Sequence, residues 1–204
     1  MRPRDEQKKA RLYDAAIQVI NTEGFEGASV SRIAQLAQVS PATLYLFFAN
    51  KKDMINKLYL ALCEDIGERL SAALRRAPCP KDQLYLAWQD VFDYARDLPA
   101  RFQFLEQYKN SPQIDSVSHA QGRQYFCPLK DLYTDLRQAQ ILKDVPDELI
   151  DAHLFFPLIH LIKLERIGEV RLTPELLNAC FEASWDAIRH PMSPDRCPAH
   201  SPPS

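Results

Sequence analysis

The chain has 204 residues, of which 46% are apolar and 25% charged, and its net charge is −2. This length and apolar content support one large or two small packed domains, which excludes disorder over most of the chain. Only five glycines occur, and apolar residues recur at i, i+3 and i+4 rather than in alternation, so the sequence predicts an all-α fold.

The five cysteines are scattered and never in C-x-x-C spacing. Such a set is typical of reduced thiols in a cytoplasmic protein. The longest apolar run, residues 154–164, is interrupted by Pro157, His160 and Lys163, and the N-terminus has no signal-peptide pattern. We therefore expect a cytoplasmic protein that does not enter a membrane.

Charge is distributed unevenly along the chain. Residues 1–52 hold eight basic and five acidic side chains, whereas the remainder holds seventeen basic and twenty-two acidic ones. A basic N-terminal part on an acidic body suits a protein that binds a polyanion through its N-terminal part. The alternative is a chance imbalance on a solvated surface.

The first predicted helix spans residues 5–23, and Gly24 ends it. Four basic residues precede or open this helix: Arg2, Arg4, Lys8 and Lys9. Two interpretations stay open for them, an arm that contacts phosphates and a solvated charged terminus.

Residues 29–53, SVSRIAQLAQVSPATLYLFFANKKD, predict two short helices joined by a tight turn, with a third helix after them. Their apolar positions have helical spacing and would form a small core: Ile33, Ala34, Ala37, Val39, Leu44 and Phe47 or Phe48. Ser40 can cap a helix whose first residue is Pro41. Asn50 can cap the next helix, with Asp53 completing a capping box.

This arrangement is typical of a helix that enters the major groove of DNA. We expect Thr43, Tyr45 and Lys51 to contact DNA, with Lys51 placed beside a helix N-terminus where phosphate binds. Three further candidate contacts are Arg32, Ser40 and Ala42.

The segment resembles the N-terminal domain of TetR-family transcriptional regulators, and the segment 51–62 is most similar to multidrug-efflux repressors of that family. The matching residues are Ala15, Ala16, Ile20, Gly24, Phe25, Ser29, Ile33, Ala34, Ala37, Val39, Thr43, Leu44, Tyr45, Phe48 and Lys51. Two positions depart from the family pattern. Gln38 stands where the turn usually has glycine, so we expect it to adopt a left-handed conformation at a cost of about 1 kcal/mol. Phe47 replaces the usual histidine or tyrosine.

From residue 50 onward six helices are predicted, the first being the one capped by Asn50. They span residues 50–76, 81–97, 99–110, 117–139, 146–167 and 174–189. The expected architecture is a three-helix helix-turn-helix DNA-binding domain at 1–50 and a larger helical ligand-binding and dimerisation domain at 51–190. The proline- and serine-rich residues 191–204 predict a disordered tail.

The last two helices carry wide apolar faces that a body of this size cannot easily bury alone. We expect them to pair with a second copy as a four-helix bundle, which the resemblance also implies. The predicted interface residues are Leu158, Leu161, Ile162, Phe181 and Trp185. A two-fold homodimer would place two reading helices in successive major grooves.

A binding site for a small lipophilic effector is predicted from aromatic residues on separate helices with one carboxylate nearby. Its candidates are Tyr59, Trp88, Phe92, Tyr108, Asp151, Phe155 and Phe156. Rings beside an acid suit a flat lipophilic cation. Core packing is the alternative for each aromatic residue, and an exposed helix charge is the alternative for Asp151.

We therefore expect a homodimeric repressor that a lipophilic, possibly cationic, small molecule releases from a palindromic double-stranded DNA operator. The alternative is a DNA-binding protein of the same architecture that acts through a protein partner and has no inducer. Motifs of phosphate loops, hydrolases and metalloproteases are absent from the sequence, so we expect no enzyme activity and no cofactor. His153 and His160 share a helical face but lack a third ligand, so no metal site is predicted.

Overall fold

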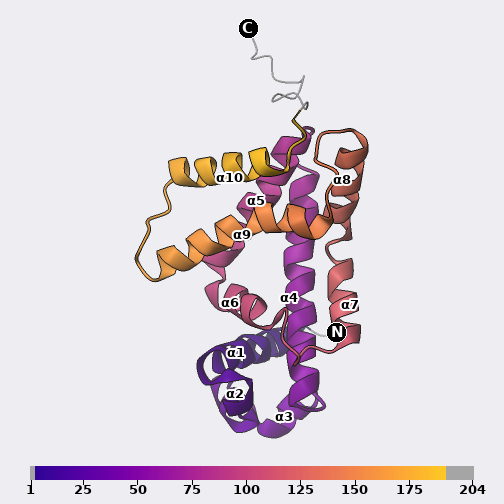
Figure 1. Cartoon of the computed structure of the whole chain (residues 1–204). Helices are drawn as coiled ribbons and strands as arrows, with labels where there is room; N and C mark the ends of the chain where they lie inside the picture. Colours follow the sequence, from indigo (N-terminus) through magenta and orange to yellow (C-terminus); the bar gives the residue numbers. More distant parts are fainter. Residues whose placement is uncertain (1–2, 192–204) are drawn as a thin grey trace. The chain divides into compact units, whose positions relative to one another are not determined.

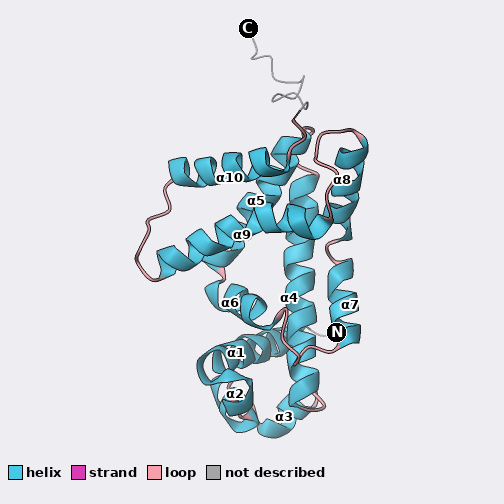
Figure 2. Ribbon diagram, viewed as in Figure 1, coloured by secondary structure: helices cyan, strands magenta, loops and turns pink. Residues whose placement is uncertain are grey.

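The computed structural model describes residues 3–191, with side chains from residue 7 onward. Within that part the chain forms helices and no strand (Figures 1 and 2), and one antiparallel bridge joins Leu142 and Arg189. The helices are α1 (Pro3–Gly27), α2 (Val30–Leu36), α3 (Pro41–Tyr45), α4 (Lys51–Leu74), α5 (Pro80–Asp97), α6 (Pro99–Tyr108), α7 (Ser116–Gln124), α8 (Cys127–Gln138), α9 (Asp147–Arg166) and α10 (Pro174–Ile188). The predicted all-α fold class is confirmed.

The chain divides into two compact units. The first unit comprises Met1–Asp65 and Ala95–Tyr125, and the second comprises Ile66–Tyr94 and Phe126–Ser204. Helices α4 and α5 each contribute residues to both units. The domain boundary expected after residue 50 stays a prediction, and the expected disordered tail lies, from residue 192 onward, outside the described residues.

In the first unit, α1 packs against α2 and α6, and α2 packs against α3 (Figure 1). Arg101 of α6 donates to Asp14 of α1 at 2.8 Å and to Asp65 of α4 at 3.3 Å. Because the guanidinium group has a planar set of donors, one side chain joins three helices of this unit.

Asn56, a buried polar residue of α4, also organises the first unit. Its amide nitrogen donates to the carbonyl oxygens of Lys52, at 2.8 Å, and Gln113, at 3.4 Å. Its amide oxygen accepts a hydrogen bond from the backbone N–H of Asp115 at 2.9 Å. One side chain of α4 therefore satisfies two backbone groups of the loop before α7, the Gln113 carbonyl oxygen and the Asp115 N–H.

In the second unit, α9 packs along α10 (Figure 1). An aromatic cluster lies between α5 and α10, where the Phe181 ring lies edge-on to Tyr85 and Trp88 with centroids 4.8 and 5.7 Å away. The Trp88 indole donates to the Leu154 carbonyl oxygen at 2.9 Å. This cluster therefore joins α5, α9 and α10 in one core.

Two helix ends differ from the sequence prediction. The single helix expected at 117–139 is wrong, because the chain leaves helical geometry at Phe126 (φ −101°, ψ 3°) and α8 starts anew with Pro128 in its first turn. Proline has no N–H with which to continue α7. Gly24 (φ 72°, ψ 169°) interrupts α1 as predicted, but a further helical segment follows it to Gly27.

No helix in the described part of the chain combines the length and apolar character that crossing a membrane requires.

Replacing Asn56 by alanine should lower the free energy of unfolding by about 1–3 kcal/mol, because the Gln113 carbonyl and the Asp115 N–H lose their partner. Urea denaturation followed by circular dichroism measures this loss. Asn178, exposed on α10, provides the matched control, and its change to alanine should stay within about 0.5 kcal/mol of the parent. Equal stability of the two variants would contradict the role given to Asn56.

Candidate DNA-binding interface

Side-chain caps fix where α2 and α3 begin. The Ser29 hydroxyl accepts from the Arg32 N–H at 3.1 Å, and the Ser40 hydroxyl accepts from the Thr43 N–H at 3.2 Å. Pro41 occupies the first turn of α3, where its missing N–H leaves no hydrogen bond unmade. The helix start predicted at Ser40 and Pro41 is confirmed.

The turn between α2 and α3 depends on Gln38, whose φ is 56°. Its N–H donates to the Gln35 carbonyl oxygen at 3.1 Å, and the next N–H, that of Val39, donates to Ala34 at 3.0 Å. These bonds close the end of α2 and require a left-handed residue. The left-handed conformation predicted for Gln38 is confirmed.

Small and aromatic residues form the core beneath the two helices. Ala34 of α2 and Ala37 at its C-cap are 1% and 3% exposed, and Leu44 of α3 is 1% exposed. Phe48 is also buried and stacks on Tyr13 of α1 with ring centroids 5.6 Å apart. The methyl side chains of the alanines let the backbones of α2 and α3 approach closely. Because a five-residue helix is not stable alone, this packing holds α3 in its orientation.

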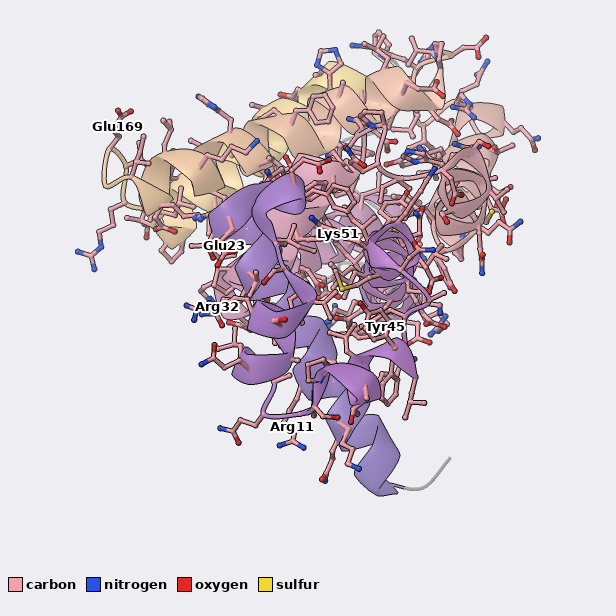
Figure 3. All side chains as sticks on the ribbon, turned by 90° about the horizontal axis from the view of Figure 1, so that it is seen from below. Arg11, Glu23, Arg32, Tyr45, Lys51 and Glu169 are labelled. Atoms are coloured by element: carbon pink, nitrogen blue, oxygen red, sulfur yellow. The ribbon has the colours of Figure 1, made fainter. Side chains whose placement is uncertain are left out.

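The outer face of α3 and its C-cap is exposed. Tyr45 is 56% exposed and Leu46 is 83% exposed, and Ala42 lies one turn earlier on the same face. Figure 3, which looks at this end of the first unit, shows the Tyr45 side chain on the outside of α3. The contacts predicted from sequence did not include Leu46, which lies on the same exposed face as Ala42 and Tyr45.

The start of α4 is capped on both sides. Asn50 Oδ1 accepts from the Asp53 N–H, and Asp53 Oδ2 accepts from the Ala49 N–H, both at 2.8 Å. Burial alone would raise the pKa of the Asp53 carboxyl, but Lys57, 2.8 Å away, and the Ala49 N–H outweigh it and hold the pKa below its usual value. Asp53 thus stays ionised and keeps the predicted cap intact at neutral pH.

Both basic side chains of the predicted DNA-contact set already have protein partners. Lys51 Nζ donates to the Glu26 carbonyl oxygen at 2.8 Å and lies 4.8 Å from the centre of the Phe25 ring. An ammonium group has three donors, so Lys51 can hold the end of α1 and still bind a phosphate. Arg32 pairs with Glu23 at 3.7 Å across α1 and α2 (Figure 3).

The structure brings the six predicted DNA contacts into one region of the first unit, on α2, on α3 with its cap, and at the start of α4. Ser40 and Thr43 are joined there, with their hydroxyl oxygens 2.9 Å apart. These residues stay predicted contacts.

The predicted effector residues are divided between the two units. Tyr59 and Tyr108 belong to the first unit and are each 5% exposed. Trp88 is buried in the second unit, whose α9 also carries the half-buried Phe155 and the exposed Phe156; Phe92 of α5 is half-buried. The Tyr59 ring fills the space beside Gly122, where an added Cβ would lie 2.7 Å from it. Their role in effector binding stays a prediction.

Asp151, the predicted cation-binding carboxylate, is engaged within the second unit. It forms an ion pair with Lys130 of α8 and accepts from the Tyr133 hydroxyl at 3.0 Å. Burial first, and then this carboxylate, raises the pKa of Tyr133 well above its usual value. A cationic effector would therefore have to displace Lys130 to use the charge of Asp151.

The predicted interface residues lie mostly inside one protomer. Leu158, Ile162, Phe181 and Trp185 are between 0% and 5% exposed, and Leu161 is half-buried. Other apolar residues of α9, its C-cap and α10 face solvent. They are Leu149, Phe156, Ile167 and Leu176, with exposed fractions of 44%, 57%, 68% and 36%. In an interface through α9 and α10, these exposed residues would contact the second copy, and the predicted residues would pack beneath them.

Two family models match the chain. Residues 12–58 match the model described as bacterial regulatory proteins, tetR family, and residues 80–189 match the model described as tetracyclin repressor-like, C-terminal domain. The first match covers the helix-turn-helix and the second covers more than half of the chain. The relatives found with them are transcriptional regulators and not enzymes.

An uncharacterised helix-turn-helix regulator of Haemophilus influenzae is 20% identical over 88% of this chain and 94% of its own length. A fatty acid metabolism regulator of Bacillus subtilis is 33% identical, but over only 39% of this chain and 41% of its own length.

Solved structures share the fold. A TetR-family regulator of Marinobacter aquaeolei superimposes with a TM-score of 0.88 at 24% identity, covering 93% of this chain and all (100%) of its own. FadR of Bacillus subtilis in complex with stearoyl-CoA superimposes with a TM-score of 0.69 at 18% identity, covering 88% of this chain and 99% of its own.

Replacing Gln38 by glycine should raise the free energy of unfolding by up to about 1 kcal/mol, because glycine adopts positive φ without steric cost. Replacing Gln35, an exposed residue within α2, by glycine is the matched control and should lower it by about 1 kcal/mol. Thermal melts of both variants measure the difference. A Gln38 variant that is destabilised as much as the Gln35 variant would contradict strain at this turn.

Proposed function

This chain belongs to the TetR family of bacterial DNA-binding transcriptional regulators, and we propose that it is a homodimeric repressor acting in the cytoplasm, which a lipophilic small molecule releases from a palindromic operator. The observation that carries the DNA-binding part is the exposed face of α3, held by the Ser40 cap and the buried α2–α3 core, with Lys51 at the nearby start of α4. We propose that Tyr45 and Thr43 contact the groove, that Lys51 binds a phosphate, and that Arg32, Ser40 and Ala42 support them.

We propose that the protein dimerises through α9 and α10, because a two-fold dimer is what a palindromic operator requires. The exposed Phe156, Ile167 and Leu176 give these two helices an outer apolar surface, which a second copy would cover. A two-fold axis then repeats α3 at a spacing of about 34–36 Å or a multiple of it, so two half-sites are read together.

A lipophilic effector fits the aromatic content of the helical body, and we propose one with an acyl chain. FadR of Bacillus subtilis, which shares the fold, was solved with stearoyl-CoA, and a fatty acid metabolism regulator of the same species matches this chain in sequence. The pairing of Asp151 with Lys130 disfavours a cation at that carboxylate. The similarity to multidrug-efflux repressors stays a prediction.

Helix α4 supports a route for the response. It begins with Lys51 and continues without interruption to Leu74, so it contributes residues to both compact units. We propose that an effector displaces this helix, which changes the position of Lys51 and of the adjoining reading helices and lowers operator affinity.

Replacing Lys51 by alanine should weaken binding to all duplexes alike, because one phosphate contact per protomer is lost. The negative slope of log K against log salt should become less steep by about 1 per protomer. The measurement is a fluorescence-anisotropy titration at several salt concentrations, with duplexes enriched from a random pool. Arg75, exposed just after α4, supplies the control variant Arg75→Ala, which should keep the parental slope. Identical slopes for parent and Lys51→Ala would remove Lys51 from the DNA interface.

Long-chain acyl-CoA should quench the fluorescence of the second unit's tryptophans, Trp88 and Trp185, and release the enriched duplex. A lipophilic cation such as rhodamine 6G should do neither at the same concentration, because Lys130 already neutralises Asp151. Release by the cation and not by acyl-CoA would contradict the acyl effector. DNA binding that no member of the panel alters would favour the alternative of a protein partner.

A further inference from the structure

The reading segment has an unusual side-chain chemistry. Residues 41–49, PATLYLFFA, include no charged and no amide side chain. Guanine is usually read by Arg or Lys, and adenine by Asn or Gln, through paired hydrogen bonds to the base edge in the major groove. The segment therefore lacks the groups that make these contacts.

The hydroxyl groups of the segment cannot make these paired hydrogen bonds to a base edge. Thr43 is half-buried, and its hydroxyl oxygen lies 2.9 Å from that of the Ser40 cap. Tyr45 is left as the exposed polar side chain between residues 41 and 49, and it presents a single hydroxyl. One hydroxyl does not distinguish one base pair from another as a paired contact does.

Leu46 is the most exposed large apolar side chain of the segment, at 83%. It occupies the C-cap of α3 with helical geometry (φ −71°, ψ −23°), so it continues the face formed by Ala42 and Tyr45. The one base substituent in the major groove that an aliphatic side chain recognises is the C5-methyl group of thymine. Burying Leu46 against such a methyl group would remove both from water.

We propose that Leu46 determines operator specificity by contacting thymine methyl groups in the major groove, with Ala42 beside it on the same face. This inference rests on the proposed DNA-binding function and adds the class of base that the site selects. The operator should accordingly hold a thymine in each half-site at the position that faces Leu46. Loss of that methyl group should weaken binding about fourfold per half-site, and about tenfold or more for the dimer.

The experiment uses the full-length protein and a duplex enriched from a random pool. Each thymine position is replaced in turn by deoxyuridine, which lacks only the methyl group, in both half-sites together, and dissociation constants are measured by fluorescence anisotropy. Deoxyuridine placed in the flanking sequence controls for changes in duplex geometry. The protein variants are Leu46→Ala, Leu46→Met and Val117→Ala, the last altering an exposed apolar residue of α7.

The expected result is a position at which deoxyuridine weakens binding about tenfold for the parent, Val117→Ala and Leu46→Met, but less than twofold for Leu46→Ala. A parent protein that binds thymine and deoxyuridine duplexes equally overturns the proposal. Equal losses in the parent and in Leu46→Ala also overturn it, because another residue would then read the methyl group. Failure to enrich any duplex would instead refute the proposed operator binding, and this inference with it.

Discussion

The close packing of α2 against α3 is the constraint on which the candidate DNA-binding interface depends. Helix α3 has five residues, too few to be stable alone. Its position comes from Leu44 and Phe48, which are buried, and from the methyl-sized Ala34 and Ala37, which let the helices approach. Gln38 accepts a left-handed conformation to make the turn short enough. The strain at one residue therefore helps to fix the direction of the reading face.

Several basic side chains of the first unit already interact with groups of the protein itself. Lys51 holds the end of α1, Arg32 pairs with Glu23, and Arg101 joins three helices through two carboxylates. These exposed or half-exposed pairs each contribute little to stability, but they orient the side chains that carry them. A phosphate would meet a lysine whose position is already set, so less side-chain entropy is lost on binding.

Local chemistry predicted from the sequence agrees with the structure where neighbouring residues decide it. The caps at Ser40 and Asn50 and the conformation of Gln38 depend on residues within five positions of one another, and all three were predicted. The break at Phe126 was missed although Pro128 signalled it. Long-range partners could not be predicted: the pairing of Asp151 with Lys130, and the burial of Phe181 and its neighbours within one protomer, depend on how distant helices pack.

The central claim is that the segment from α2 to the start of α4 contacts DNA. Hydrogen–deuterium exchange, measured with and without an enriched duplex, tests it most directly, because peptides across residues 29–53 report on this segment and peptides from α9 and α10 serve as the internal reference. The account predicts slower exchange within residues 29–53 when DNA is bound. Unchanged exchange there, with slower exchange confined to α9 and α10, would contradict it.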